Sequence, residues 1–259
     1  MVHPKISIIT VVFNGAQLLE ETIKSVLLLA YDSIEYIIID GGSTDGSVEV
    51  IDRFKDRISY SISEPDKGIY DAMNKGIRKA TGDWINFMNC GDRFSSSDAL
   101  GFFEEDQFNN VDVIYGDALI KYPTFNKKFN GHDINNFWKA MPFCHQSCFV
   151  KSTLMKEYSF DTRYKYAADF EFLYKAYLND KKFFHISIEI CQYDFTQGAS
   201  VLHSLKSVKE RRMIVLKYGA DFKKRLYYNL YIGYIQWSIG IKRILGKRLT
   251  AWVTRFLNT

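Results

Sequence analysis

Two kinds of apolar pattern alternate along the N-terminal part of the chain. Continuous runs rich in β-branched residues occupy residues 6–13 (ISIITVVF), 34–40 (IEYIIID) and 84–88 (WINFM), as is typical of strands buried on both faces. Segments with apolar side chains at helical spacing follow the first two runs, at residues 16–30 and 48–56. The alternation predicts an α/β fold in which a mixed, mainly parallel sheet is flanked by helices.

The alternation continues further along the chain. A strand is expected at residues 58–64 and a helix at residues 69–80. Asp45 or Ser47 is expected to cap the helix at residues 48–56. The remaining segments with a predicted structure are a helix around 98–108, strands at 111–115 and 118–121, a strand at the end of 137–150, a helix at 167–180, and helices from residue 204 onward.

Polar residues follow each of the four predicted parallel strands. They are Asn14, residues 40–42 (DGG), residues 64–67 (EPDK) and residues 89–92 (NCGD). The carboxyl ends of parallel strands share one edge of a sheet, and ligands of open α/β sheets bind at that edge. We therefore expect these four loops to form one site.

Three acidic residues and one histidine are candidates for the chemistry of this site. Asp40 suits a hydrogen bond to a nucleoside, Asp92 a divalent cation at a diphosphate, and Asp169 a general base. Each acid also has a purely structural interpretation. Asp40 could form an Asx turn at the end of a strand, Asp92 could belong to an ordinary Gly-Asp turn, and Asp169 could be an acid in the first turn of a helix. His145 suits a proton-shuttling or hydroxyl-binding role, although a lone histidine beside a strand is more often structural.

Five segments, taken in order and spacing, carry a resemblance to a known family. They are ISIITVVFNGAQLLEETIKSVL, EYIIIDGGSTDGSVEVI, SEPDKGIYDAMNKGIRKATGDWINFMNCGD, CHQSCFVK and RYKYAADFEFL. Over roughly residues 5–200 the chain resembles family-2 glycosyltransferases of the GT-A fold, a Rossmann-like α/β fold. More narrowly it resembles the bacterial branch that builds O-antigen, colanic-acid and capsule repeat units.

The resemblance implies inverting transfer of a hexose from a UDP-sugar, with glucose or galactose as the expected sugar. The implied cofactor is Mn²⁺ or Mg²⁺, and the implied acceptor is a sugar on undecaprenyl diphosphate. Carried over by position, the resemblance assigns Asp169 as the catalytic base and Asp92 as the metal ligand. It assigns the donor contacts to Thr10, Phe13, Asn14, Asp40, Asp66, Lys67 and Asn89. Residues 197–200 (QGAS) end the resembling region and are expected to touch donor or acceptor.

The metal turn departs from the family pattern. The first acid of the family's DXD-type motif is Asn89 here, which offers only a neutral amide oxygen. We therefore expect weak metal binding that depends mainly on the donor diphosphate.

Charge divides the chain into an acidic body and a basic tail. Residues 203–259 carry 13 Lys and Arg against two acidic residues, a net charge of +11, whereas residues 1–202 carry 21 basic and 28 acidic residues, a net charge of −7. We predict a glycosyltransferase domain over residues 1–202 and a basic, aromatic helical extension over residues 203–259. The two parts are expected to meet different partners.

The tail is expected to lie on a membrane surface. Its uncharged stretch, residues 226–241, is too short to span a bilayer, and it combines aromatic residues with basic flanks. This combination suits the headgroup layer of an anionic leaflet, and the alternative is a basic helix pair folded back on the body. Together with the resemblance, it implies a peripheral enzyme in the cytoplasm, at the inner face of the bacterial cytoplasmic membrane. Nucleic-acid binding is disfavoured because the aromatic residues form one apolar run. The oligomeric state is left open.

Cysteine usage agrees with a cytoplasmic location, since four cysteines without CxxC spacing indicate free thiols. Two other functional classes compete with an active transferase. A catalytically silent scaffold in a polysaccharide-assembly complex would tolerate Asn89. A sugar nucleotidyltransferase would need a Gly-rich, basic phosphate loop after the first strand, and FNGAQ does not supply one.

Overall fold

The protein divides into two compact units, Met1–Val201 and Leu202–Thr259. The structure, a computed structural model, describes residues 3–104, 108–122, 125–131, 133–194 and 204–257, with side chains up to residue 240. Each unit is described by itself. Residues 197–200, which were expected to touch a substrate, lie outside the described residues.

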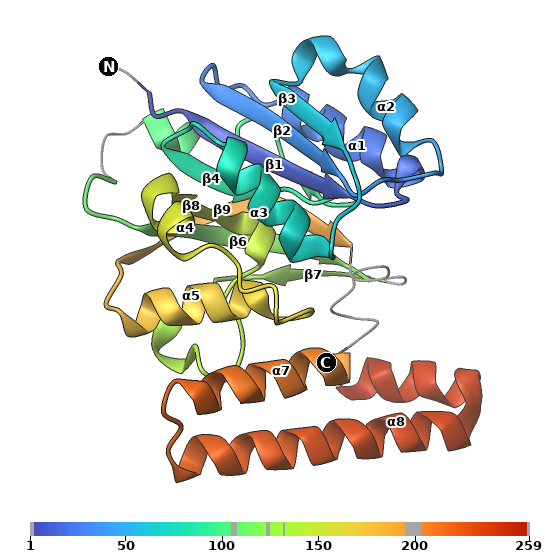
Figure 1. The fold of residues 1–259 in the computed structure, drawn as a ribbon. Helices are drawn as coiled ribbons and strands as arrows, with labels where there is room; N and C mark the ends of the chain where they lie inside the picture. The colour runs from blue at the N-terminus through green and yellow to red at the C-terminus, as the bar shows by residue number, and fades with distance from the viewer. Residues whose placement is uncertain (1–2, 105–107, 123–124, 132, 195–203, 258–259) are drawn as a thin grey trace. The chain divides into compact units, whose positions relative to one another are not determined.

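One sheet organises the first unit, in the order β3-β2-β1-β4-β8-β6-β9-β5, with β7 paired to β6 (Figure 1). Its first half is parallel: β1 (Ile6–Val12) pairs with β2 (Ile34–Asp40) and β4 (Trp84–Phe87), and β3 (Tyr60–Ser63) pairs with β2. The carboxyl ends of these four strands therefore lie at one edge, as predicted from their continuous apolar runs.

The second half of the sheet is mixed. Strand β8 (Cys148–Lys151) runs antiparallel to both β4 and β6 (Val113–Lys121), while β9 (Phe183–Asp194) runs parallel to β6. The short strands β5 (Arg93–Phe94) and β7 (Asn126–Phe129) pair antiparallel with β9 and β6. Because β8 is antiparallel to β4, the residues before β8 lie at the same edge as the carboxyl end of β4.

Helices cover both faces of the parallel half. Side chains alternate between the faces of a strand. Ile6, Ile8 and Val12 pack in one core with helix α1 (Ala16–Leu27) and helix α2 (Ser47–Arg53). On the other face Ile9 contacts Gly76 of helix α3 (Ile69–Lys79), where a side chain would collide with it. The mixed half carries helices α4 (Ser152–Tyr158) and α5 (Ala168–Leu178).

A buried acid joins strands at the opposite end of the sheet from the predicted site. The Glu35 carboxylate accepts hydrogen bonds from Ser7, Thr81 and Lys5. Burial by itself raises the pKa of Glu35, but these hydrogen bonds outweigh it and lower the pKa to about 2. Glu35 is therefore charged and structural.

Several expectations for the region after β4 are wrong. A 3₁₀ helix, Gly101–Glu104, takes the place of a helix around 98–108, of which residues 105–107 are not described. The two strands expected at 111–121 are one strand, β6, whose register against β9 shifts between Tyr115 and Ala118. Gly116 lies at this irregularity, where a side chain would collide with the Ile190 side chain and the Ile188 carbonyl. Elements that were not predicted are β5, β7, β9 and α4.

The N-terminus of α2 also differs from expectation. Gly46, in a left-handed conformation (φ 98°), is the N-cap residue and supplies no side chain. Asp45 instead accepts a hydrogen bond from the backbone N–H of Ser47, the first residue of the helix, at 3.1 Å. Asp45 thus satisfies one free amide of the helix end without being the cap itself.

The second unit consists of helix α7 (Ser204–Lys217) and helix α8 (Phe222–Leu257) (Figure 1). Gly219, at φ 87°, lies in the turn between them, in a conformation that favours glycine. No helix in the part of the chain that the structure describes is long and apolar enough to cross a membrane.

Candidate functional site

Hydrogen bonds between two loops tie the ends of β1 and β2 together. The Asn14 side-chain oxygen accepts the backbone N–H of Thr44 at 2.9 Å, and the backbone N–H of Asn14 donates to the Ser43 hydroxyl at 2.7 Å. Asn14 has φ 51°, a left-handed conformation that asparagine tolerates better than most residues. In this structure Asn14 shapes the edge of the sheet by joining the two loops.

Asp40, at the end of β2, is the centre of the second loop. Its carboxylate is completely buried and accepts four hydrogen bonds, from the backbone amides of Gly42 and Ser43 and from the hydroxyls of Ser43 and Ser63. Both oxygens are therefore occupied by the protein. In this structure Asp40 therefore holds the loop of residues 41–43 in place. This agrees with the Asx-turn interpretation, and the bond from Ser63 also ties the loop to β3.

Thr10 and Phe13, two further candidates for donor contacts, differ in their exposure to solvent. The Thr10 side chain is completely buried, and its hydroxyl donates to the Met88 carbonyl at 2.7 Å, so it cannot line a nucleotide at the edge of the sheet. The Phe13 side chain is 66% exposed although it directly follows β1. An exposed aromatic ring at the carboxyl edge provides a flat surface for a base or sugar.

Asp66 and Lys67 lie beside the Asp40 loop. The Asp66 carboxylate lies directly against Gly41, where a Cβ would collide with it, and the Phe13 ring is close enough to touch such a Cβ. Asp66 also accepts the backbone N–H of Gly68 at 2.7 Å. Lys67 is exposed. Phe13, Gly41, Asp66 and Lys67 thus gather around the ends of β1, β2 and β3.

The turn of residues 89–92 is anchored to helix α1. The Thr22 hydroxyl donates to the Asp92 carbonyl at 2.8 Å and accepts the backbone N–H of Gly91 at 3.0 Å. Gly91 has φ 99°, which favours glycine. The backbone of the turn is therefore held by helix α1, and the side chains of the turn are the groups that we consider for contact with a ligand.

The side chains of this turn offer two hard oxygen ligands. Asp92 is 6% exposed and accepts a hydrogen bond from the Gln146 amide at 2.7 Å. The Asn89 side-chain oxygen is buried and has no hydrogen-bond partner among the described residues. Burial, followed by the charge of Asp92, raises the pKa of Cys90 to about 12, so this thiol stays protonated.

A divalent cation fits this donor set as part of a shared site. An unpartnered amide oxygen beside a carboxylate suits Mg²⁺ or Mn²⁺, which are bound by one or two carboxylates plus phosphate oxygens. No cluster of three or more His, Cys, Asp or Glu side chains that could hold a metal occurs in the described residues. The protein by itself would therefore hold the ion through Asp92 and Asn89 only.

Asp169 lies in the first turn of α5 and faces an aromatic cluster. Its carboxylate accepts hydrogen bonds from the Tyr70 hydroxyl at 2.9 Å and from the backbone N–H of Phe170 at 2.8 Å. The Tyr70 ring contacts Phe160, with centroids 5.5 Å apart. The second oxygen of Asp169 belongs to a partly exposed side chain, so the carboxylate is both held in place and reachable.

Sequence patterns did not indicate three of the residues that hold these acids. Gln146 and Tyr70 lie 54 and 99 positions from the carboxylates that they contact, and Thr22 lies 70 positions from Asp92. No local pattern reports such pairs. The polar segment His145-Gln146-Ser147 at the start of an apolar strand was the available signal, and only its histidine was considered.

Comparison with known sequences adds independent information. The model of the family described as "Glycosyl transferase family 2" matches residues 7–190. An uncharacterized glycosyltransferase of Mycobacterium tuberculosis is 33% identical over 208 residues, which cover 74% of this chain and 76% of the relative. A PGL/p-HBAD biosynthesis glycosyltransferase of Mycobacterium bovis is 28% identical over 188 residues, 69% of this chain and 72% of the relative.

Solved structures share the fold at low sequence identity. Staphylococcus aureus TarS (residues 1–349), in complex with UDP-GlcNAc, superposes with a TM-score of 0.68 at 16% identity, covering 86% of this chain and 69% of TarS. The mannosyltransferase PcManGT from Pyrobaculum calidifontis, in complex with GDP-Man and Mn²⁺, gives a TM-score of 0.67 at 16% identity, covering 99% and 80%.

The buried position of Asp40 generates a prediction about stability. Asp40→Asn weakens the charge-assisted bonds to two amides and two hydroxyls, and it should lower the free energy of unfolding by about 1–3 kcal/mol in urea titrations. Asp66→Asn, at a partly exposed acid of the same site, is the matched control and should cost less than about 1 kcal/mol. If Asp40→Asn is as stable as the wild type and loses only nucleotide affinity, the positioning role is wrong.

Proposed function

Because the chain belongs to glycosyl transferase family 2, we propose that the site at the carboxyl edge of β1–β4 transfers a hexose from a UDP-sugar to a hydroxyl of a lipid-diphosphate-linked sugar. The observation that carries this proposal is that two of the predicted acids are held differently by the protein. Asp92 is fixed beside an unpartnered amide oxygen, and Asp169 is fixed by Tyr70 but stays partly exposed. The fold and the glycosyltransferase class are those of its relatives.

The donor is proposed to lie across the ends of β1–β3. Phe13 offers an exposed ring, and Asp66 and Lys67 offer a carboxylate and a cation for ribose and phosphate. TarS was solved with UDP-GlcNAc and PcManGT with GDP-Man, and these ligands support a nucleotide-sugar donor. UDP-glucose or UDP-galactose is our proposed donor, by the resemblance described above.

A divalent cation is proposed beside the donor diphosphate. PcManGT was solved with Mn²⁺, and Asp92 with Asn89 would hold the ion here. When bound, the cation supplies neutralisation of the charge that develops on the leaving diphosphate. Gln146 keeps one Asp92 oxygen in place through its amide, so the carboxylate is oriented before the donor arrives.

Asp169 is proposed as the general base. Inverting transfer requires a base on the face of the anomeric carbon opposite the leaving group, where it removes the proton of the attacking hydroxyl. The Tyr70 hydroxyl and the Phe170 amide fix one Asp169 oxygen. The other oxygen is proposed to accept the proton. The acceptor itself is proposed to be a sugar on undecaprenyl diphosphate in surface polysaccharide assembly.

The second unit is proposed to bind the membrane surface that holds such an acceptor. Five exposed apolar side chains recur every three or four positions along α8, and therefore share one side of the helix: Phe222, Leu226, Leu230, Tyr234 and Trp237. We call these residues the apolar stripe. A stripe of this kind on a helix in a basic segment is typical of helices that lie in the headgroup layer.

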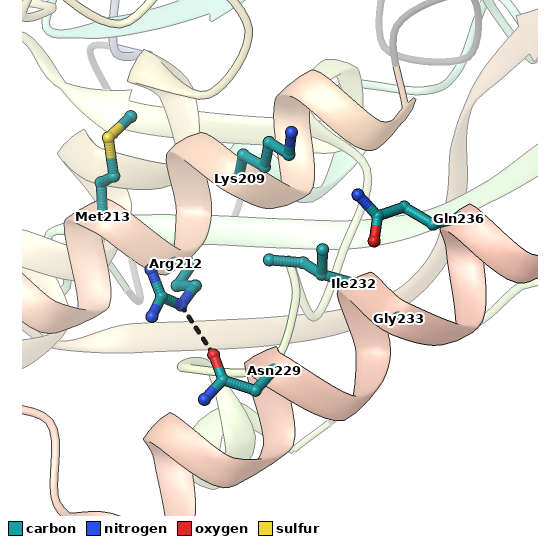
Figure 2. Close-up of a pocket in the computed structure, with 7 residues that line it drawn as sticks. All are labelled: Lys209, Arg212, Met213, Asn229, Ile232, Gly233 and Gln236. Carbon is teal, nitrogen blue, oxygen red and sulfur yellow. Dashed lines mark hydrogen bonds between the residues drawn. The ribbon is translucent and has the colours of Figure 1, made fainter.

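A groove between α7 and α8 adds cations to this unit (Figure 2). Lys209, Arg212 and Met213 line it from α7, and Asn229, Ile232, Gly233 and Gln236 line it from α8. The Arg212 Nε donates to the Asn229 side-chain oxygen at 3.2 Å, which fixes the guanidinium at the groove. Positive charge over an apolar floor suits an anionic lipid surface, where each basic residue contributes about 1 kcal/mol. Peripheral attachment at the inner face of the cytoplasmic membrane is our proposal.

Asp169→Asn tests the mechanism. If Asp169 is the base, sugar transfer should fall roughly 10²–10⁴-fold, because a positioned base contributes that much. UDP affinity, measured by calorimetry, should stay near the wild-type value. Asparagine is also a competent helix-start residue, so stability should change by no more than about 1 kcal/mol. Near-normal turnover would rule out the base and leave the helix-start interpretation. An active wild type, assayed with UDP-glucose and UDP-galactose, also rules out the silent scaffold.

The metal turn gives a second expectation. Asp92→Ala should abolish transfer or steeply raise the Mn²⁺ concentration needed, because it removes the one carboxylate of the turn. Asn89→Asp should keep activity and lower that concentration, since it adds a second carboxylate. Asp52→Ala, at an exposed acid of α2, is the control and should behave as wild type. Full activity in excess chelator would exclude a metal role for Asp92.

Membrane binding can be measured by sedimentation with vesicles. The full chain should bind phosphatidylglycerol vesicles and not phosphatidylcholine vesicles, and it should dissociate as salt rises. Leu230→Ser in the apolar stripe should weaken binding about tenfold, the loss expected for one buried leucine. The matched control is Leu28→Ser on α1, because Leu28 is 70% exposed and Leu230 is 65% exposed. Equal effects of the two variants would refute the proposed surface.

A further inference from the structure

His145, immediately before β8, has two polar atoms that the protein does not satisfy. Both ring nitrogens are buried, and neither has a hydrogen-bond partner among the described residues. The ring itself is well packed: it stacks on Phe87 with centroids 5.5 Å apart and lies 6.1 Å from the Phe160 ring. A buried polar group without a partner destabilises the folded state, so this histidine is unfavourable for the folded protein on its own.

Packing does not explain the histidine. Its neighbours Phe87 and Phe160 are aromatic, and a phenylalanine would make similar ring contacts without burying nitrogens. Nor does the backbone of the described residues use the ring, since neither ring nitrogen has a hydrogen-bond partner there. The nitrogens therefore need a partner that is not part of the described protein.

The position of His145 indicates where that partner comes from. The next residue, Gln146, holds Asp92 on the diphosphate side of the site. On the other side, Phe160 contacts both His145 and Tyr70, and Tyr70 holds Asp169. Burial lowers the pKa of His145, and the Asp169 carboxylate opposes that effect, so the ring is within electrostatic reach of the proposed base. His145 is thus connected to both acids, to Asp92 through its neighbour Gln146 and to Asp169 through Phe160 and Tyr70.

The chemistry of a neutral imidazole limits the choice of partner. It offers one N–H donor and one acceptor nitrogen that point in different directions, and a sugar hydroxyl, which both donates and accepts, can pair with either of them. We propose that His145 binds a hydroxyl of the acceptor sugar, next to the hydroxyl that Asp169 deprotonates, and thereby selects and positions the acceptor. The proposal rests on the proposed transferase function and adds a substrate contact on the acceptor side.

His145→Phe is the informative variant, because it keeps the aromatic packing and removes both nitrogens. It should raise the melting temperature or leave it unchanged, since it removes two unsatisfied polar atoms. It should also lower kcat/KM for octyl glycoside acceptors (glucoside, galactoside and N-acetylglucosaminide) roughly 10–100-fold, the worth of one or two buried hydrogen bonds. UDP affinity should not change. His145→Gln, which retains a donor and an acceptor, should recover part of the lost activity.

Deoxy acceptors identify the contact. Wild type should lose activity with one monodeoxy analogue of the preferred octyl glycoside, and His145→Phe should show little further loss with that same analogue. Equal losses in the two enzymes for every analogue would overturn the contact. A His145→Phe protein with wild-type kcat/KM, or with a lower melting temperature that His145→Gln does not share, would also overturn it. Reduced UDP affinity would assign the ring to the donor and refute the acceptor contact.

The wild-type assay separates this inference from the function on which it rests. If the wild type transfers no sugar from any nucleotide sugar tested, the proposed function fails. If the wild type is active and the acceptor kinetics of His145→Phe are unchanged, the proposed function stands and only the His145 contact is lost.

Discussion

The pairing of β4 with a parallel strand on one side and an antiparallel strand on the other is the constraint on which the site depends. Parallel pairing with β1 places the 89–92 turn beside the ends of β1 and β2. Antiparallel pairing with β8, in which Asn86 lies opposite Phe149, brings the residues before β8 to the same edge. The Asn86 amide donates to the carbonyls of Gln146 and Cys148, which fixes that entry segment. One strand therefore aligns the loops that we propose to bind the donor with the segment that we propose to bind the acceptor.

Hydrogen-bond satisfaction distinguishes the framework of the site from its contact groups. Glu35 and Asp40 are buried acids whose oxygens accept several bonds from the protein, and they hold strands and loops in place. The Asn89 oxygen and the His145 nitrogens are also buried, but no described residue satisfies them. Native proteins pair nearly all buried polar groups, but Asn86 Oδ1, Ser95 Oγ and Arg211 Nε are unpaired among the described residues in the same way. A missing partner therefore indicates a ligand only where other groups of the site lie nearby, as at Asn89 and His145. Residue type alone does not separate the two groups.

Local sequence patterns predicted the parallel half of the sheet. The mixed half depends on contacts between residues far apart in the sequence, which local patterns do not report. Runs such as residues 6–13 and 34–40 are apolar on both faces, so their strand character is encoded within a few residues. Strand β9 was missed because charged and aromatic residues interrupt its alternation, and its length depends on pairing with β6. The family resemblance assigned Thr10 to the donor, yet alternation along β1 turns its side chain into the core.

The single carboxylate of the 89–92 turn is consistent with the way the turn is buried. Two carboxylates in this partly buried turn would repel each other whenever no cation is present, and like charges in a poorly hydrated site are costly. Asn89 avoids that repulsion, and the Gln146 amide compensates the remaining charge of Asp92 through a hydrogen bond. The turn can therefore hold its shape without a metal ion. A turn with one carboxylate is also expected to bind a cation more weakly than a turn with two. Cation and donor diphosphate are then expected to bind together, because the phosphate oxygens supply the ligands that the turn lacks.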